Sequence, residues 1–102
     1  MVCKRTNTVI FADEIYMNLQ HDGTFTSISK YAPELTIRAS SISKDFAAGG
    51  YRLGWALFPE ELNYLWKNMV QVGSAIYSCV NPVVQLATAD LLTLNHFYKS
   101  TT

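Results

Sequence analysis

The stretch from Ser40 to Trp55 reads Ser-Ser-Ile-Ser-Lys-Asp-Phe-Ala-Ala-Gly-Gly-Tyr-Arg-Leu-Gly-Trp, and the rest of the chain is organised around it. It lies between two apolar runs that have the pattern of strands. Hydroxyl side chains come just before Lys44, and Arg52 follows that lysine eight positions later, with small residues between them. A loop of this composition can hold a phosphorylated ligand at one end and present an amine at the other.

Three short apolar segments predict a small sheet in a protein of the α/β class. Residues 8–12 form a continuous apolar and β-branched run, which is typical of a strand buried on both faces, as in a parallel sheet. About twenty residues separate this run from the next one, which is enough for the crossover that parallel strands need. We therefore expect three central strands at about residues 8–13, 35–41 and 52–58.

Two helices are expected to flank the strands, at about residues 59–78 and 82–99. Two acids follow Pro59, and Asn81 precedes Pro82, so that each segment opens with residues that favour the first turn of a helix. Apolar residues then recur at helical spacing, among them Trp66 and Met69 in the first helix. The simplest interpretation of these stripes is core packing, so we assign them no part in binding a cofactor.

The composition limits the chain to one domain and argues against several kinds of partner. The 102 residues include eight acidic and eight basic side chains, so the net charge favours neither nucleic acid nor a membrane surface. Only 16% of the residues are charged, which suits a piece of a larger α/β core, or an oligomer, better than a lone monomer. Cys3 and Cys79 lack metal-ligand spacing, and no apolar run is long enough to span a bilayer. By default we expect a soluble, cytoplasmic protein without a bound metal.

Asp13 and Tyr16 lie where the first strand should end. In open α/β sheets, ligands bind outside the carboxyl ends of the strands, and both side chains can face such a crevice. A carboxylate there can keep a heterocyclic nitrogen protonated, and a phenol can hydrogen-bond to a ring oxygen. A simpler interpretation of Asp13, as a carboxylate that caps the next turn, stays open at this point.

Three pieces of the sequence together resemble the central part of class I/II, fold-type I aminotransferases, which use pyridoxal 5′-phosphate. The pieces are Asp13-Glu14-Ile15-Tyr16, Ser41-Ile42-Ser43-Lys44-Asp45-Phe46 and Gly50-Tyr51-Arg52-Leu53-Gly54. The separations from the aspartate to the lysine and from the lysine to the arginine also fit that family. Tyr51 is a departure, because it stands where the family most often has tryptophan. The resemblance spans roughly the first sixty residues, and the helices after Pro59 look like the family's continuation.

This resemblance implies a role for each residue. Lys44 would form the internal Schiff base and later carry the proton between the substrate's α-carbon and the cofactor. Asp13 would pair with the pyridinium nitrogen, and Tyr16 would hydrogen-bond to the phenolic oxygen of the ring. The phosphate ligands would be Ser41, Ser43 and Arg52, with Ser41 and Arg52 preferred. These roles agree with what the cofactor needs, namely an amine, a carboxylate near its nitrogen and a phosphate cradle.

The resemblance also implies that residues 1–102 are a partial large domain, which lacks the N-terminal part of that domain and the C-terminal small domain. The family's glycine-rich phosphate turn, its ring-stacking side chain and its arginine for the substrate carboxylate have no counterpart in the sequence. We therefore expect the full-length protein, implied to be a homodimer, to transfer an amino group between an amino acid and a 2-oxo acid. The isolated chain should be inactive or nearly so. The alternative is a non-catalytic fragment that serves only in folding or in interaction with another subunit.

Two other motifs fit less well. Ser41 and Lys44 have the Ser-x-x-Lys spacing of serine β-lactamases, but the Ser-Asp-Asn and Lys-Thr-Gly partners of that motif do not occur. The glycines from Gly49 to Gly54 have phosphate-loop spacing, but Trp-Ala replaces the required Lys-Ser/Thr pair. We therefore retain the aminotransferase resemblance.

Overall fold

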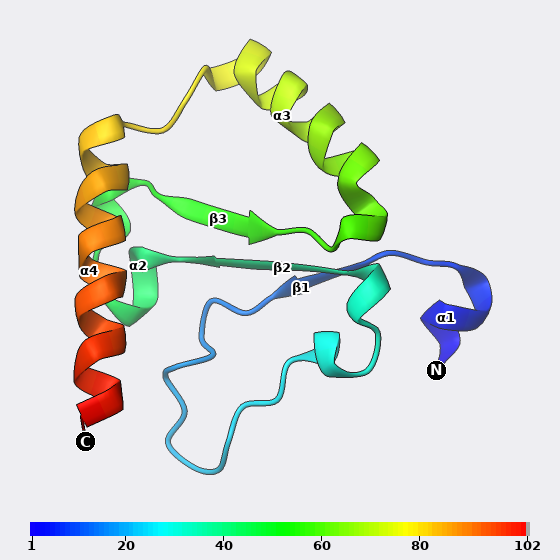
Figure 1. The fold of residues 1–102 in the computed structure, drawn as a ribbon, viewed down its shortest axis with the longest axis horizontal. Helices are drawn as coiled ribbons and strands as arrows, with labels where there is room; N and C mark the ends of the chain where they lie inside the picture. The colour runs from blue at the N-terminus through cyan, green and yellow to red at the C-terminus, as the bar shows by residue number, and fades with distance from the viewer. Residues whose placement is uncertain (102) are drawn as a thin grey trace.

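A three-stranded mixed sheet forms the centre of the structure, a computed structural model that describes the fold of residues 1–101 and the side chains of residues 1–94. The strands are β1 (Ile10–Asp13), β2 (Thr36–Ser41) and β3 (Gly54–Leu57), in the order β1-β2-β3 (Figure 1). Strands β1 and β2 are parallel, whereas β3 returns antiparallel to β2. The three predicted strands are thus confirmed, as is the parallel crossover between the first two.

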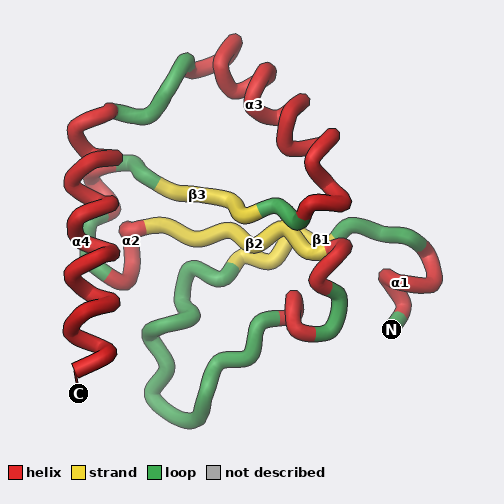
Figure 2. The backbone as a smooth tube through the Cα atoms, viewed as in Figure 1, coloured by secondary structure: helices red, strands yellow, loops and turns green. Residues whose placement is uncertain are grey.

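Helices and short 3-10 turns connect and follow the strands (Figure 2). They are α1 (Val2–Thr6), η1 (Ile28–Lys30), η2 (Pro33–Leu35), α2 (Ile42–Asp45), η3 (Gly49–Tyr51), η4 (Glu60–Leu62), α3 (Asn63–Tyr77) and α4 (Pro82–Thr101). The helix predicted for residues 59–78 therefore begins as the 3-10 turn η4. In Figure 1, α4 runs across the end of the sheet beside α2, and α3 runs away from the sheet. None of the described helices combines the length and the apolar character needed to cross a membrane.

The boundary between α3 and α4 follows the residue types that the sequence places there. The backbone N–H of Val83 donates to Asn81 Oδ1 at 2.9 Å, so Asn81 caps α4 as predicted. Pro82 occupies the first helical position, where a missing N–H costs little. Helix α3 ends at Tyr77 because Ser78 has a φ of 64°, outside the right-handed helical region.

The buried core is small and centres on β2. Its apolar members have relative exposures of 4% or less, and they are Ala32, Ile37, Ile42 and Leu62. Ile37 lies within β2, and Ile42 opens α2 directly after that strand. Ile42 therefore lies at the carboxyl end of β2, close to Lys44, whereas Ala32 precedes β2 and Leu62 follows β3.

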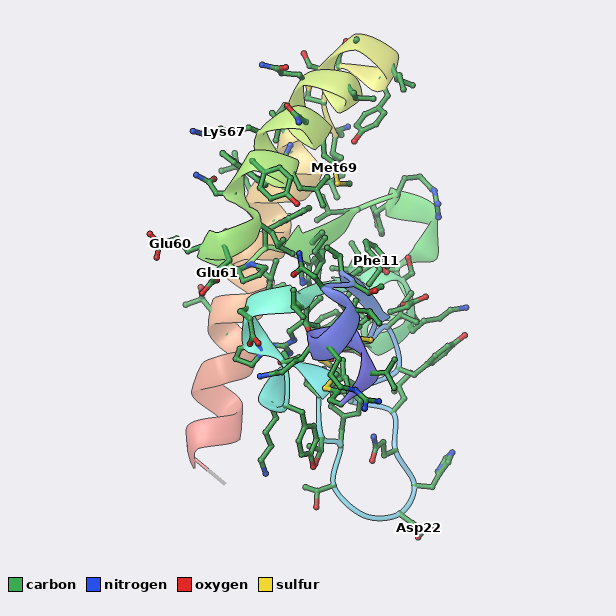
Figure 3. The ribbon with its side chains drawn as sticks, turned by 90° about the vertical axis from the view of Figure 1, so that its right-hand side faces the viewer. Phe11, Asp22, Glu60, Glu61, Lys67 and Met69 are labelled. Carbon is green, nitrogen blue, oxygen red and sulfur yellow. The ribbon has the colours of Figure 1, made fainter. Side chains whose placement is uncertain are left out.

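Two expectations about burial are wrong in this structure. Phe11 of β1 is 60% exposed, so the first strand is not buried on both faces. Trp66 and Met69 of α3 are 45% and 47% exposed, and Figure 3 shows Met69 on that helix. In both places the hydrophobic pattern located the element correctly. Burial additionally needs a second layer of side chains, which the described part of the chain does not place over these residues.

The chain has an open shape. Its accessible surface is 7718 Å², whereas a compact folded monomer of 11.5 kDa exposes about 5,800 Å². Its radius of gyration is 15.5 Å, against about 13 Å for a compact domain of this length. Large hydrophobic side chains on β1, α3 and α4 contribute to the exposed surface.

An ion pair joins α1 to the turn before β2, far from the carboxyl ends of the strands. Lys4 Nζ lies 2.9 Å from Glu34 Oε1, and the hydrogen bond from Lys4 is the main cause that lowers the pKa of Glu34 below its ordinary 4.5. Because this pKa is lowered in the folded chain, any stabilisation is present above pH 4.5 and is lost as the pH falls through the folded-state pKa. Solvent screens the pair, since both side chains are exposed.

Gly54 sets the spacing between β2 and β3. A Cβ atom added there would lie 3.1 Å from the Ser40 carbonyl oxygen and 3.4 Å from Ser41 Cβ, so the two strands would have to shift apart. We expect Gly54→Ala to lower the free energy of unfolding by about 1–3 kcal/mol in urea denaturation.

Gly50→Ala is the matched control for this change, because nothing lies within 4 Å of a Cβ added at Gly50. Its effect on the free energy of unfolding should stay within about 0.5 kcal/mol. Equal losses in the two variants would show that the close approach of β3 to β2 is not what requires glycine at position 54.

Candidate functional site

The carboxyl ends of β1 and β2 lie side by side, and the predicted site residues gather there. In the parallel register Asp13 pairs with Ala39, two residues before Ser41. Alternate residues of a strand share a face, so Asp13 and Ser41 lie on one face of the sheet, with their Cα atoms about 8 Å apart. Helix α2 begins at the next residue and carries Lys44 from the same edge.

Tyr16 reaches the lysine from the turn that follows β1. Its ring centroid lies 5.7 Å from Lys44 Nζ, within the range of a cation–π contact. Backbone hydrogen bonds of 3.0 Å hold this turn, from the Met17 N–H to the Glu14 carbonyl and from the Leu19 N–H to the Tyr16 carbonyl. Tyr16 and Lys44 are both exposed, so the amine contacts an aromatic ring and is still accessible to a ligand.

Asp13 caps the turn after β1, which is the simpler of its two interpretations. Its Oδ1 atom accepts a hydrogen bond from the backbone N–H of Ile15 at 3.3 Å. The side chain is exposed, and a carboxylate that caps through one oxygen keeps the acceptor capacity of the other. The cap therefore orients the carboxylate at the end of the strand and leaves its second oxygen available to accept a hydrogen bond.

The two predicted phosphate-binding serines have different surroundings. Ser41 has an extended backbone with φ of −158°, and its Oγ accepts the backbone N–H of Ser43 at 3.1 Å, which caps α2. Because the hydroxyl of Ser41 accepts in this bond, its hydrogen is left to donate to an anion. Ser43 lies against the returning loop, since a Cβ atom added at Gly49 would be 3.8 Å from Ser43 Cβ.

The turn η3 brings Arg52 back towards the start of α2. Its backbone has a φ of 58°, a left-handed conformation that is sparsely populated outside glycine and that functional loops often retain. Arg52 Nη1 donates to the Gly49 carbonyl at 2.8 Å, and the Ile42 N–H donates to the Leu53 carbonyl at 3.4 Å, which closes the loop. A guanidinium has five N–H donors, so this exposed arginine retains donors for a phosphate.

Sequence reasoning missed two polar contacts that surround the site. Glu14 is buried and forms an ion pair with Arg38 of β2, whose Nε lies 2.7 Å from Glu14 Oε2. On the exposed side, Asn18 Nδ2 donates to Asp45 Oδ2, which ties the segment after Tyr16 to α2. The sequence contained a signal for the first contact, because an arginine within an apolar strand needs a polar partner. The second had none, since its two residues are 27 positions apart on exposed segments.

The sequence and the fold agree with one family of proteins. The family model described as aminotransferase class I and II matches residues 1–101. The chain therefore belongs to this family, which confirms the resemblance stated from the sequence motifs.

Three known proteins show how much of a family member the chain covers. A protein of Saccharomyces cerevisiae named as a probable kynurenine–oxoglutarate transaminase is 34% identical over an alignment of 103 positions, which covers 96% of this chain and 23% of that protein. An aspartate/prephenate aminotransferase of Thermus thermophilus is 34% identical over 84 residues, which are 82% of this chain and 21% of that protein. A solved structure of a Thermus thermophilus aspartate aminotransferase mutant, complexed with tryptophan, has a TM-score of 0.81 and 30% identity, covering 90% of this chain and 23% of that one. The chain thus spans less than a quarter of the length of each of these proteins.

Because Ser41 caps α2, the two serines are expected to contribute unequally to the free energy of unfolding. We expect Ser41→Ala to lower the free energy of unfolding by about 1 kcal/mol, because the first turn of α2 loses its side-chain acceptor. Ser43→Ala, in the same turn, is the control and should change this free energy by less than about 0.5 kcal/mol. Urea denaturation followed by circular dichroism measures both, and equal losses would contradict the cap.

Proposed function

We propose that this chain is the cofactor-binding core of a pyridoxal 5′-phosphate-dependent aminotransferase, with Lys44 as the residue that holds the cofactor. The observation that carries the proposal is the Tyr16 ring beside the Lys44 amine, at the edge of the sheet where Asp13 ends β1. Family membership supports the reaction class, and the relatives named above are transaminases or aminotransferases.

The chemistry of the side chains fits this cofactor. An aldehyde needs an amine, a ring nitrogen needs a carboxylate, and a phosphate needs a guanidinium and hydroxyls. The groups at this edge of the sheet that meet these needs are those of Lys44, Asp13, Arg52, Ser41 and Ser43. The Cα atoms of Asp13 and Ser41 are about 8 Å apart, so their side chains can contact opposite ends of one ligand.

When bound, pyridoxal 5′-phosphate supplies an electron-withdrawing ring that stabilises the negative charge left on the substrate's α-carbon after its proton leaves. Lys44 Nζ would hold the cofactor, and would take up that proton and return it. The carboxylate of Asp13 would keep a proton on the ring nitrogen, and the hydroxyl of Tyr16 would donate a hydrogen bond to the phenolic oxygen. The phosphate ligands would be Ser41, Ser43 and Arg52.

The complete reaction is proposed for the longer protein to which such a core belongs. Its substrates would be an amino acid and a 2-oxo acid, its assembly a homodimer and its location the cytoplasm. These proposals rest on the family alone, because the chain spans less than a quarter of the length of the relatives it matches. None of the proposed ligands is a group for the substrate's carboxylate, so the chain by itself should capture the cofactor better than it turns over substrate.

Covalent capture of the cofactor tests the assignment of Lys44. The chain incubated with pyridoxal 5′-phosphate should develop a visible absorption band, and borohydride should fix the cofactor to Lys44, as located by peptide mass spectrometry. Lys44→Arg keeps the positive charge but removes the nucleophilic amine, so both signals should disappear.

The four other lysines, Lys4, Lys30, Lys67 and Lys99, serve as internal controls for non-specific labelling. An adduct spread evenly over all lysines would refute the assignment, as would an unchanged absorption band in the Lys44→Arg variant.

The exposed surface favours a second candidate function, in which the chain is non-catalytic and acts through association with another subunit. Its accessible area of 7718 Å² exceeds the value for a compact monomer by about 1,900 Å². An excess of this size is comparable to what a protein–protein interface buries. Much of α3 is available for such a contact, including Ile76, which is 74% exposed.

Analytical ultracentrifugation and the capture of pyridoxal 5′-phosphate on Lys44 separate the two candidates. If association is the function, the isolated chain should self-associate and should not capture the cofactor, and Ile76→Ser should weaken the association. Gln71→Ser is the control, because it changes an exposed polar residue of the same helix. A monomeric chain with turnover comparable to that of an intact aminotransferase would overturn this alternative and the expected inactivity of the isolated chain.

A further inference from the structure

Glu14 is a buried carboxylate that has no part in the chemistry proposed above. It follows Asp13 at the end of β1, and only 5% of the residue is exposed. Its backbone N–H donates to the Ala39 carbonyl at 2.9 Å, so the pairing with β2 continues one residue past the strand. Strand alternation places its side chain on the face opposite Asp13. Because a buried charge is costly without partners, the groups that bind Glu14 indicate what it does.

Three parts of the fold meet at this carboxylate. Glu14 Oε2 accepts a hydrogen bond from Arg38 Nε of β2 at 2.7 Å, and Oε1 accepts one from the hydroxyl of Ser27. Ser27 Oγ also accepts the backbone N–H of Ser29 at 3.1 Å, which caps η1. The Glu14 side chain therefore joins the end of β1, the middle of β2 and the start of η1.

The turn that carries Tyr16 starts at Glu14. The Glu14 carbonyl accepts the Met17 N–H at 3.0 Å, and within this turn the Tyr16 ring comes to lie 5.7 Å from Lys44 Nζ. Packing does not hold the two site residues beside Glu14, because Asp13 is exposed and Tyr16 is 58% exposed. The buried anchor nearest to both of them in the chain is Glu14.

We propose that Glu14 is a positioning residue of the cofactor site. Through Arg38 it fixes the end of β1 and the following turn against the strand that leads into α2. Asp13 and Tyr16 are thereby held at the edge that carries Lys44. The inference rests on the proposed function only for the identity of the ligand, because the contact between the ring and the amine is a property of the chain itself.

The first measurement needs no cofactor. The Tyr16 ring should shift the Cε protons of Lys44 upfield in the NMR spectrum of a chain with ¹³C-labelled lysine, and Tyr16→Leu calibrates the shift by removing it. We expect Glu14→Gln, which keeps the size of the side chain but not its charge, to lose most of this shift. The matched control is Glu34→Gln, which breaks the exposed ion pair with Lys4 and should leave the shift unchanged.

A second set of variants separates positioning from loss of the fold. Arg38→Lys keeps the positive charge but not the planar Nε donor, so it should retain part of the shift. Arg38→Met breaks the ion pair from the other side. The double variant Glu14→Gln/Arg38→Met should lose no more of the shift than either single variant, because both changes remove the same interaction. All variants are compared under conditions in which circular dichroism shows the wild-type signal, and Arg38→Lys replaces Glu14→Gln as the deciding variant if the latter does not fold.

Borohydride-fixed cofactor on Lys44 gives an independent measurement of the same positioning. We expect the rate of adduct formation to fall by about tenfold to a hundredfold in Glu14→Gln relative to Glu34→Gln, as displacement of a positioned group typically causes. A folded Glu14→Gln or Arg38→Lys chain with the wild-type shift and the wild-type adduct rate would overturn the proposal. If the wild-type chain forms no adduct while the NMR shift responds as expected, the proposed function fails and the positioning role of Glu14 stands.

Discussion

The parallel pairing of β1 with β2 is the constraint on which the rest of the structure depends. It aligns the carboxyl ends of two strands that are far apart in the chain, and so brings Asp13 to the edge that leads through Ser41 to Lys44. The register of this pairing is specific, because a slip of one residue would exchange the faces on which Asp13 and Glu14 lie. Asp13 would then lie on the face of Arg38, and the buried carboxylate of Glu14 would lose its partner. The register thus determines the candidate site and the buried ion pair together.

The antiparallel return of β3 completes the site from the other side. It closes the Ser41–Arg52 loop on itself, so that a lysine and an arginine eight residues apart both lie near the start of α2. The backbone there tolerates little variation, since Gly54 approaches the Ser40 carbonyl closely and Arg52 has a left-handed backbone. This half of the site is local in sequence, whereas Asp13 and Tyr16 come from a separate segment. The two segments are joined by two contacts, the buried Glu14–Arg38 pair and the exposed Asn18–Asp45 hydrogen bond.

The chain belongs to the class I and II aminotransferases but spans less than a quarter of the relatives it matches. Its low content of charged residues and its large accessible area go together, because many of its hydrophobic side chains lie on the surface. Hydrophobic side chains at helical spacing on α3, and Phe11 on β1, have the pattern of core positions, but the described residues place no second layer over them. A sheet of three strands with a small core thus holds the residues of the candidate site in place while leaving much apolar surface exposed.

The sequence by itself determined the features that depend on neighbouring residues. Hydrophobic runs located the three strands, and Asn81 and Pro82 located the start of α4, because strand pattern and capping act over a few residues. The Ser-x-Ser-Lys spacing likewise predicted one half of the candidate site from loop composition alone. Only the tertiary structure decided the direction of β3, the exposure of Phe11, and the partners of Glu14 and Asp45. These features depend on which distant segments meet and in what register. Short-range pattern does not encode that choice, because it is set by the closure of long loops and by the simultaneous satisfaction of buried polar groups.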